Sequence, residues 1–194
     1  MDYPRVTEIL RCFTNFDKIP QQILANAAER GSSVHALCAG IANGNWIPDG
    51  MIGETLIGYV NSFKKWVDAQ VVKFIIVEKR YTDTERCFSG QLDYVVLAKD
   101  DKLYLVDIKT SARPQKTYAV QLGAYDLLLQ NNQVKVDGAM VVYLNKDGEF
   151  PEINLIEDTT EERRIFLSAL DCWHYFNKGK KHVSRRTKRK PANE

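Results

Sequence analysis

The spacing of apolar residues predicts four helices along the chain. Two of them, over residues 21–42 and 54–70, have apolar side chains at three- and four-residue intervals. In the first, Gly31-Ser32-Ser33 predicts a break, because serine is a good N-cap for a new helix. A third helix is expected over residues 118–130. The last should begin at the capping box Thr159-x-x-Glu162 and end near residue 178.

Runs rich in β-branched and aromatic residues predict five strands. One spans about residues 72–81, and two more flank the polar centre 99–102 as a hairpin between Gly90 and Lys109. Residues 134–144 and 149–156 supply the last two. The order of elements predicts an α/β (α+β) domain with a mixed sheet flanked by helices. We expect one domain over residues 1–177, followed by a basic tail over 178–194.

The hairpin brings two carboxylates together if its turn is centred on Asp100. Asp93 then lies opposite Asp107, with Cβ atoms about 4.5–5.5 Å apart, and Lys109 lies on the same face. The two carboxylates would repel by roughly 3 kcal/mol at an effective dielectric of 20. A divalent cation would turn this repulsion into ligation. A slip of one residue in the register would turn Asp93 to the other face.

Four further residues are candidates for the same site. Glu78 ends the strand before the hairpin, and His35 follows Gly31-Ser32-Ser33. Gln121 and Tyr125 share one helix face because they are four residues apart. Taken singly, each has an ordinary structural interpretation, such as a solvated strand end, a half-buried helix face or a core histidine. Their combination with the hairpin favours a functional site.

Composition and charge narrow the class of protein. The 194 residues are 44% hydrophobic and 27% charged, which is typical of a globular domain. The sequence shows no signal-peptide pattern and no apolar run long enough for a membrane span, so we expect an intracellular protein that is not secreted. The four cysteines show no C-x-x-C spacing, which favours reduced thiols.

The charge is unevenly distributed. Residues 178–194 hold eight basic residues and one acidic residue, whereas the rest holds 19 basic and 24 acidic residues. The tail therefore carries a net +7 and the body −5. A basic tail suits a polyanion such as nucleic acid. From charge alone, a merely solubilising tail is an equal alternative.

Four motifs together resemble a known family. They are Arg30-Gly-x-x-x-His35, Gly90-x-x-Asp93, Asp107-Ile108-Lys109-Thr110 and Gln121-x-x-x-Tyr125. This set resembles the PD-(D/E)xK nuclease superfamily, in its RecB-like/Cas4-like branch with phage and mitochondrial single-domain exonucleases. The resemblance covers most of residues 4–145. It implies a restriction-endonuclease-like core.

The resemblance also implies a role for each matching residue. Asp93, Asp107 and the backbone carbonyl of Ile108 would hold Mg²⁺ or Mn²⁺, with His35 as a further ligand. Lys109 would position or activate the attacking water. Gln121 and Tyr125 would orient Lys109 or the DNA backbone. Glu78 would support the metal ligands without binding the metal directly. The residues assigned to nucleic-acid contact are Arg30, Ser33, Thr110, Gln121, Tyr125, Lys180, Lys181, Arg185 and Arg186.

The expected function is therefore that of a metal-dependent DNA nuclease, with an exonuclease favoured. The alternatives are a structure-specific endonuclease on the same fold and a noncatalytic nucleic-acid-binding module; an enzyme with another substrate is a more remote option. The partner would be single- or double-stranded DNA; a recombination or replication protein, the pathway and the oligomeric state are left open. A phage or bacterial protein of this kind would act in the bacterial cytoplasm. Many relatives carry an iron–sulfur cluster, but here only Cys12 and Cys172 lie near the matching regions, so no cluster is expected.

Overall fold

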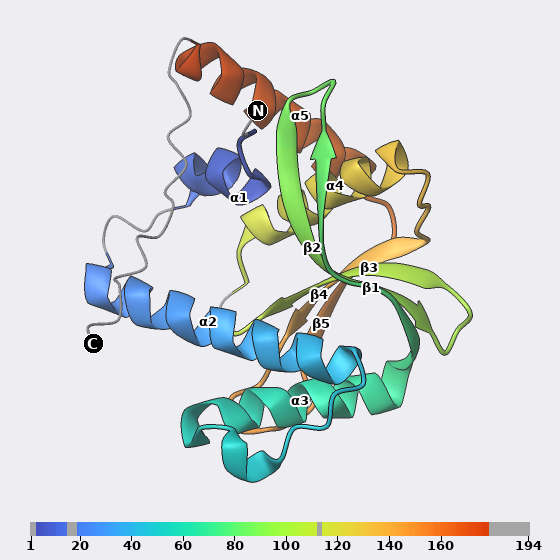
Figure 1. Cartoon of the computed structure of the whole chain (residues 1–194). Coiled ribbons are helices and arrows are strands. Elements are labelled where there is room, and N and C mark those ends of the chain that lie inside the picture. Colours follow the sequence, from blue (N-terminus) through green and yellow to red (C-terminus); the bar gives the residue numbers. More distant parts are fainter. Residues whose placement is uncertain (1–2, 15–18, 112–113, 179–194) are drawn as a thin grey trace, which may run out of the picture.

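A five-stranded mixed sheet forms the middle layer of the fold (Figure 1). The computed structural model describes residues 3–14, 19–111 and 114–178. The strands lie in the order of the sequence, and only β3 and β4 are parallel neighbours. The mixed sheet with flanking helices confirms the predicted fold class. The strands are β1 (Val71–Asp83), β2 (Phe88–Ala98), β3 (Leu103–Lys109), β4 (Gly138–Tyr143) and β5 (Glu152–Ile156).

Helices cover both faces of this sheet. The long helix α2 (Gln21–Ala42) and α3 (Glu54–Gln70) lie on one face, where α3 has the predicted limits. On the other face lie α1, α4 and α5. Their bounds, with those of two short 3₁₀ helices, are α1 (Val6–Ile9), η1 (Leu10–Phe13), η2 (Asp49–Met51), α4 (Lys116–Asn131) and α5 (Thr160–Asn177).

Each face of the sheet has its own apolar core. Along β3, Leu105 packs in the core under α4 and α5, whereas Val106 and Ile108 pack in the core under α2 and α3. This alternation is what a strand buried on both faces requires. It also fixes the faces to which the last residues of β3 can point, and so positions the site at the end of that strand.

Helix α2 is continuous, so the break predicted at Gly31-Ser32-Ser33 is wrong. Ser32 does not cap a new helix; its hydroxyl donates to the carbonyl of Ala28 at 3.0 Å, within the same helix. A glycine inside a helix costs about 1 kcal/mol. The packing of Val34 and Cys38 in the core outweighs that cost. His35 therefore lies in the middle of a 22-residue helix, not in a first turn.

The capping box predicted at Thr159 is also not formed. The Thr159 side chain makes no cap hydrogen bond. Its hydroxyl donates instead to Oδ2 of the buried Asp126 at 2.6 Å. Arg163 pairs with the same carboxylate oxygen. A buried charge needs such partners, and it competes successfully for the hydroxyl. The last two strands also begin later than predicted, at Gly138 and Glu152.

Over the part of the chain that the structure describes, no helix is both long and apolar enough to cross a membrane.

Candidate active site

The β2–β3 hairpin has the register that a turn centred on Asp100 predicts. Tyr94 pairs with Val106 and Leu97 with Leu103. The ladder ends at Tyr94 and Val106, so the predicted pair of Asp93 and Asp107 lies one residue beyond the residues that are paired. The backbone N–H of Ile108 donates to Oδ2 of Asp93 at 2.8 Å, which holds that carboxylate against the end of β3.

The neighbouring strand is distorted beside Asp93. Glu78 lies in the interior of β1, and not at its end as the sequence suggested. Its φ of 46° is in the left-handed region. Its neighbours Val77 and Lys79 form ladder pairs with β2, whereas Glu78 does not. On β2, Leu92 and Val95 both contribute to the same core, so the period-two alternation is broken between them. A non-glycine residue in this conformation costs about 1–3 kcal/mol, and such strain clusters at functional sites.

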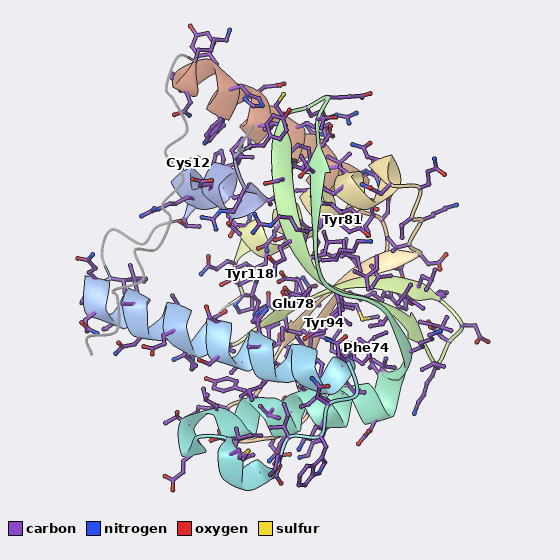
Figure 2. All side chains as sticks on the ribbon, in the orientation of Figure 1. Cys12, Phe74, Glu78, Tyr81, Tyr94 and Tyr118 are labelled. Atoms are coloured by element: carbon purple, nitrogen blue, oxygen red, sulfur yellow. The ribbon has the colours of Figure 1, made fainter. Side chains whose placement is uncertain are left out.

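Helix α2 supplies a histidine that faces the two carboxylates. His35 Nδ1 lies 3.3 Å from Asp93 Oδ1 and 3.5 Å from Glu78 Oε1, and its Nε2 lies 3.0 Å from the carbonyl oxygen of Ile108. Figure 2 shows Glu78 in the region between α2 and the β1–β2 hairpin. One donor atom from each of His35, Glu78 and Asp93 lies within 4.8 Å of the others.

This setting strongly favours the charged form of His35. Burial by itself lowers the pKa of the imidazole, but Asp93, Glu78 and the more distant Asp107 together outweigh it and raise the pKa to about 10. Both ring nitrogens then carry protons, and both face oxygen acceptors. In this state the imidazolium neutralises the carboxylates.

A second group of side chains surrounds Lys109. Its Nζ lies 2.5 Å from Asp107 Oδ2 and 3.4 Å from Gln121 Oε1. Gln121 Nε2 donates to Asp107 Oδ1 at 3.1 Å and to the Tyr125 hydroxyl at 2.8 Å. Burial raises the pKa of Asp107 to about 6, against the opposing effect of Lys109. The carboxylates of Asp107 and Asp93 outweigh the burial of Lys109 and raise its pKa.

Two residues that contact the site were not identified from the sequence. The ring of Tyr118 lies 4.8 Å from Lys109 Nζ, in a cation–π contact, and Gln91 Nε2 donates to Glu78 Oε2 at 2.6 Å. Their spacing from predicted site residues could have indicated both. Tyr118 is three residues before Gln121 on one helix face, and Gln91 is two residues before Asp93 on one strand.

Two cavities meet at helix α2. One, of about 560 Å³, is lined by His35, Glu78, Gln91 and Asp93, and it opens beside the histidine–carboxylate cluster. The other, of about 720 Å³, contains Lys109 and is lined by both apolar and polar side chains, among them Ile23 and Leu24 of α2. Gly31 and His35 border both cavities. The candidate site therefore has a cavity on each side of His35.

The structure brings together three of the nine residues predicted for nucleic-acid contact. Arg30, Thr110 and Gln121 line the larger cavity, whereas Tyr125 is buried behind Gln121. Ser33 is half-buried on α2 and does not appear among the described residues that line either cavity. The four basic residues assigned in the tail, Lys180, Lys181, Arg185 and Arg186, lie outside the described residues.

The donor set fits a divalent cation such as Mg²⁺ or Mn²⁺. Carboxylate and carbonyl oxygens suit both ions, and one imidazole favours the softer Mn²⁺. Glu78 Oε1 is buried and has no hydrogen-bond partner, which is costly unless a cation or a proton donor satisfies it. Of the cysteines, Cys38 is buried and Cys12 and Cys172 are exposed; the expected lack of an iron–sulfur cluster stays a prediction.

A mixed sheet that carries a histidine–carboxylate cluster beside a half-buried lysine has the side chains that a metal-dependent hydrolytic site requires. Consistently, a family model of the PD-(D/E)XK nuclease superfamily matches residues 13–189, and the chain belongs to this superfamily. Membership implies metal-dependent nuclease activity on nucleic acid.

Other comparisons add little. No curated protein matches the chain. Among the solved structures that match is the crystal structure of SSO0001, with 16% sequence identity and a TM-score of 0.39. That match covers 52% of this chain and 50% of that one, so the chain spans about half of the other protein. The likeness is too distant to bear on function.

Proposed function

We propose that the chain is a DNA exonuclease of the RecB-like/Cas4-like branch, dependent on Mg²⁺ or Mn²⁺. The observation that carries this proposal is the position of Asp93. Its carboxylate faces His35 on one side and accepts the backbone N–H of Ile108 on the other, one residue from Lys109. A cation site and a cationic side chain thus lie on either side of one strand end.

The ligands of the cation would be His35, Glu78, Asp93, Asp107 and the carbonyl of Ile108. A cation held there supplies a Lewis acid for the phosphate and lowers the pKa of a bound water molecule. Binding of the cation requires His35 to release a proton, so that one unprotonated ring nitrogen can coordinate the ion. Asp107 has a second task, because its Oδ2 holds Lys109 in place.

Lys109 would place its positive charge where negative charge develops on the phosphoryl oxygens. Its ammonium is held by Asp107 and Gln121, so little reorganisation is needed when the substrate binds. Gln121 is itself fixed, because its amide donates to both Asp107 and Tyr125. Tyr125 therefore acts through Gln121, from a buried position, and not by touching DNA.

The DNA would approach Lys109 through the larger cavity, past Arg30 and Thr110. We further propose that residues 1–177 form the nuclease domain and that the basic residues of 178–194 add affinity for the phosphate backbone. Such affinity is independent of sequence and falls with salt.

The test is incubation of end-labelled linear DNA, single- and double-stranded, with Mg²⁺, Mn²⁺ or EDTA. We expect cleavage with either ion and none in EDTA. Asp107→Ala and Lys109→Ala should abolish cleavage but leave DNA binding largely intact, whereas Asp147→Ala, at an exposed turn, should change neither. Full cleavage by both site variants would refute the assignment. Cleavage of covalently closed circular DNA would instead favour an endonuclease, and metal-independent binding without cleavage would favour a binding module.

A further inference from the structure

Glu78 reaches the proposed cation site from an unusual backbone position. Its left-handed φ of 46° interrupts the β1–β2 ladder, so the ladder does not hold residue 78 itself. The side chain is about three-quarters buried, and it has several rotatable bonds whose ordering costs free energy. Something other than the strand must therefore direct the carboxylate toward His35.

Gln91 provides that direction. Its Nε2 donates to Glu78 Oε2 at 2.6 Å, a short distance for a bond between an amide and a charged carboxylate. This bond occupies one carboxylate oxygen and leaves the other, Oε1, facing His35 at 3.5 Å. The two oxygens thus have separate partners, and the orientation of the carboxylate is defined.

Arg80 orients the Gln91 amide in turn. Arg80 lies opposite Gln91 in the ladder, and its Nη2 lies 3.5 Å from Gln91 Oε1. Arginine can only donate, so the amide oxygen must face Arg80 and the amide nitrogen must face Glu78. Gln91 is exposed and also lines the smaller cavity, so it plays no part in the apolar cores.

We propose that Gln91 is a positioning residue that holds Glu78 in the cation site and thereby sets the affinity of the site for divalent cations. This inference rests on the proposed function, because it assumes that the cation binds at His35, Glu78 and Asp93. Removing a residue that orients a metal ligand typically weakens metal binding by about 10- to 100-fold.

The test is the dissociation constant for Mn²⁺, measured by calorimetry on the full chain without DNA. Gln91→Met is nearly isosteric but removes the donor without adding a charge, and Gln91→Ala removes the whole amide. We expect both to weaken Mn²⁺ binding by about 10- to 100-fold, with an unchanged melting temperature in EDTA. Gln22→Ala is the matched control, since this exposed glutamine also bonds to one side chain, that of Asn26.

A second comparison separates positioning from a direct effect. In a Glu78→Gln background, Gln91→Ala should cause no further loss, because its effect passes through the carboxylate at position 78. An equal loss in that background would overturn the inference. So would unchanged Mn²⁺ binding in both Gln91 variants while Asp93→Asn weakens binding, and the proposed cation site would then stand. If Asp93→Asn also binds Mn²⁺ normally, the cation site and the role of Gln91 are both refuted.

Discussion

Lys109 has three kinds of neighbour: the carboxylate of Asp107, the amide of Gln121 and the ring of Tyr118. The carboxylate holds the ammonium by an ion pair, and the amide oxygen accepts a hydrogen bond from it. The ring adds a cation–π attraction, and the Tyr118 hydroxyl lies 3.2 Å from Ser111 Oγ, which anchors the ring. The ring should therefore help to keep Lys109 in the position that catalysis requires.

Tyr118→Leu should lower kcat by roughly 5- to 30-fold, since a partly buried cation–π contact contributes about 1–2 kcal/mol. Tyr118→Phe keeps the ring and should retain most of the activity. Steady-state kinetics on a short DNA substrate would separate kcat from KM. If the ring instead stacks on the substrate, Tyr118→Leu would raise KM and leave kcat unchanged, and the positioning role would be wrong.

His35 also leads to a prediction, because a proton and a divalent cation compete for it. With a pKa raised to about 10, nearly every metal-free molecule carries the extra proton at neutral pH. Metal binding must displace that proton, so the apparent affinity for Mn²⁺ should rise with pH, by up to about tenfold per pH unit below the pKa.

This pH dependence can be measured by Mn²⁺ titrations at pH 6.5, 7.2 and 8.0 in buffers that do not bind the ion. His35→Asn cannot hold the proton, so its affinity should be lower but should depend less on pH over the same range. Equal pH dependence in the wild-type protein and in His35→Asn would show that another group releases the proton.

At the scale of elements, local patterns predicted the structure where local interactions decide it. The apolar spacing of α3 gave both of its ends, and the symmetry of the polar residues around Asp100 gave the hairpin register. Two of the failures, the helix break and the capping box, have distant causes. Thr159 bonds to Asp126, 33 residues away, and the serines after Gly31 stay helical because α2 packs on the sheet. No local motif contains such partners.

Helix α3 depends on a close approach that only glycine permits. A Cβ atom at Gly58 would overlap the backbone carbonyl oxygen of Lys146, in the loop after β4. Backbone cannot move aside as a flexible side chain can, so α3 would have to shift. Gly58→Ala should lower the free energy of unfolding by about 3 kcal/mol, at the upper end of the usual cost of overpacking.

Chemical denaturation would measure this loss. Gly50→Ala is the control, because a Cβ there would meet nothing within 4 Å, and its effect should stay within about 0.5 kcal/mol. Similar stabilities for the two variants would mean that the α3 contact is easily relaxed.

For the molecule as a whole, the sequence predicted which residues are candidates for the site but not how all of them meet in space. Asp93, Asp107 and Lys109 were predicted from spacing within one hairpin, and Gln121 from spacing within one helix. The contact between His35 and Asp93 depends on how α2 crosses the sheet. The position of Glu78 depends on a left-handed backbone conformation that its residue type does not predict. Gln91 contributes only because Glu78 is already in place.

The charge distribution of the whole chain leads to the last prediction. Residues 1–177 carry a net charge of −5, which repels DNA, whereas residues 178–194 carry +7. If the tail supplies the phosphate contacts, the logarithm of the binding constant should fall steeply with the logarithm of salt concentration. Replacing the seven basic residues between 180 and 190 with serine should reduce that slope by up to about 6 for duplex DNA. Fluorescence anisotropy with the Lys109→Ala protein would measure this slope without cleavage.

A tail with the same composition in shuffled order is the control and should keep the full slope, because charge and not sequence is required. An unchanged slope in the serine variant would assign DNA binding to the body, despite its net negative charge, and most directly to Arg30 in the larger cavity.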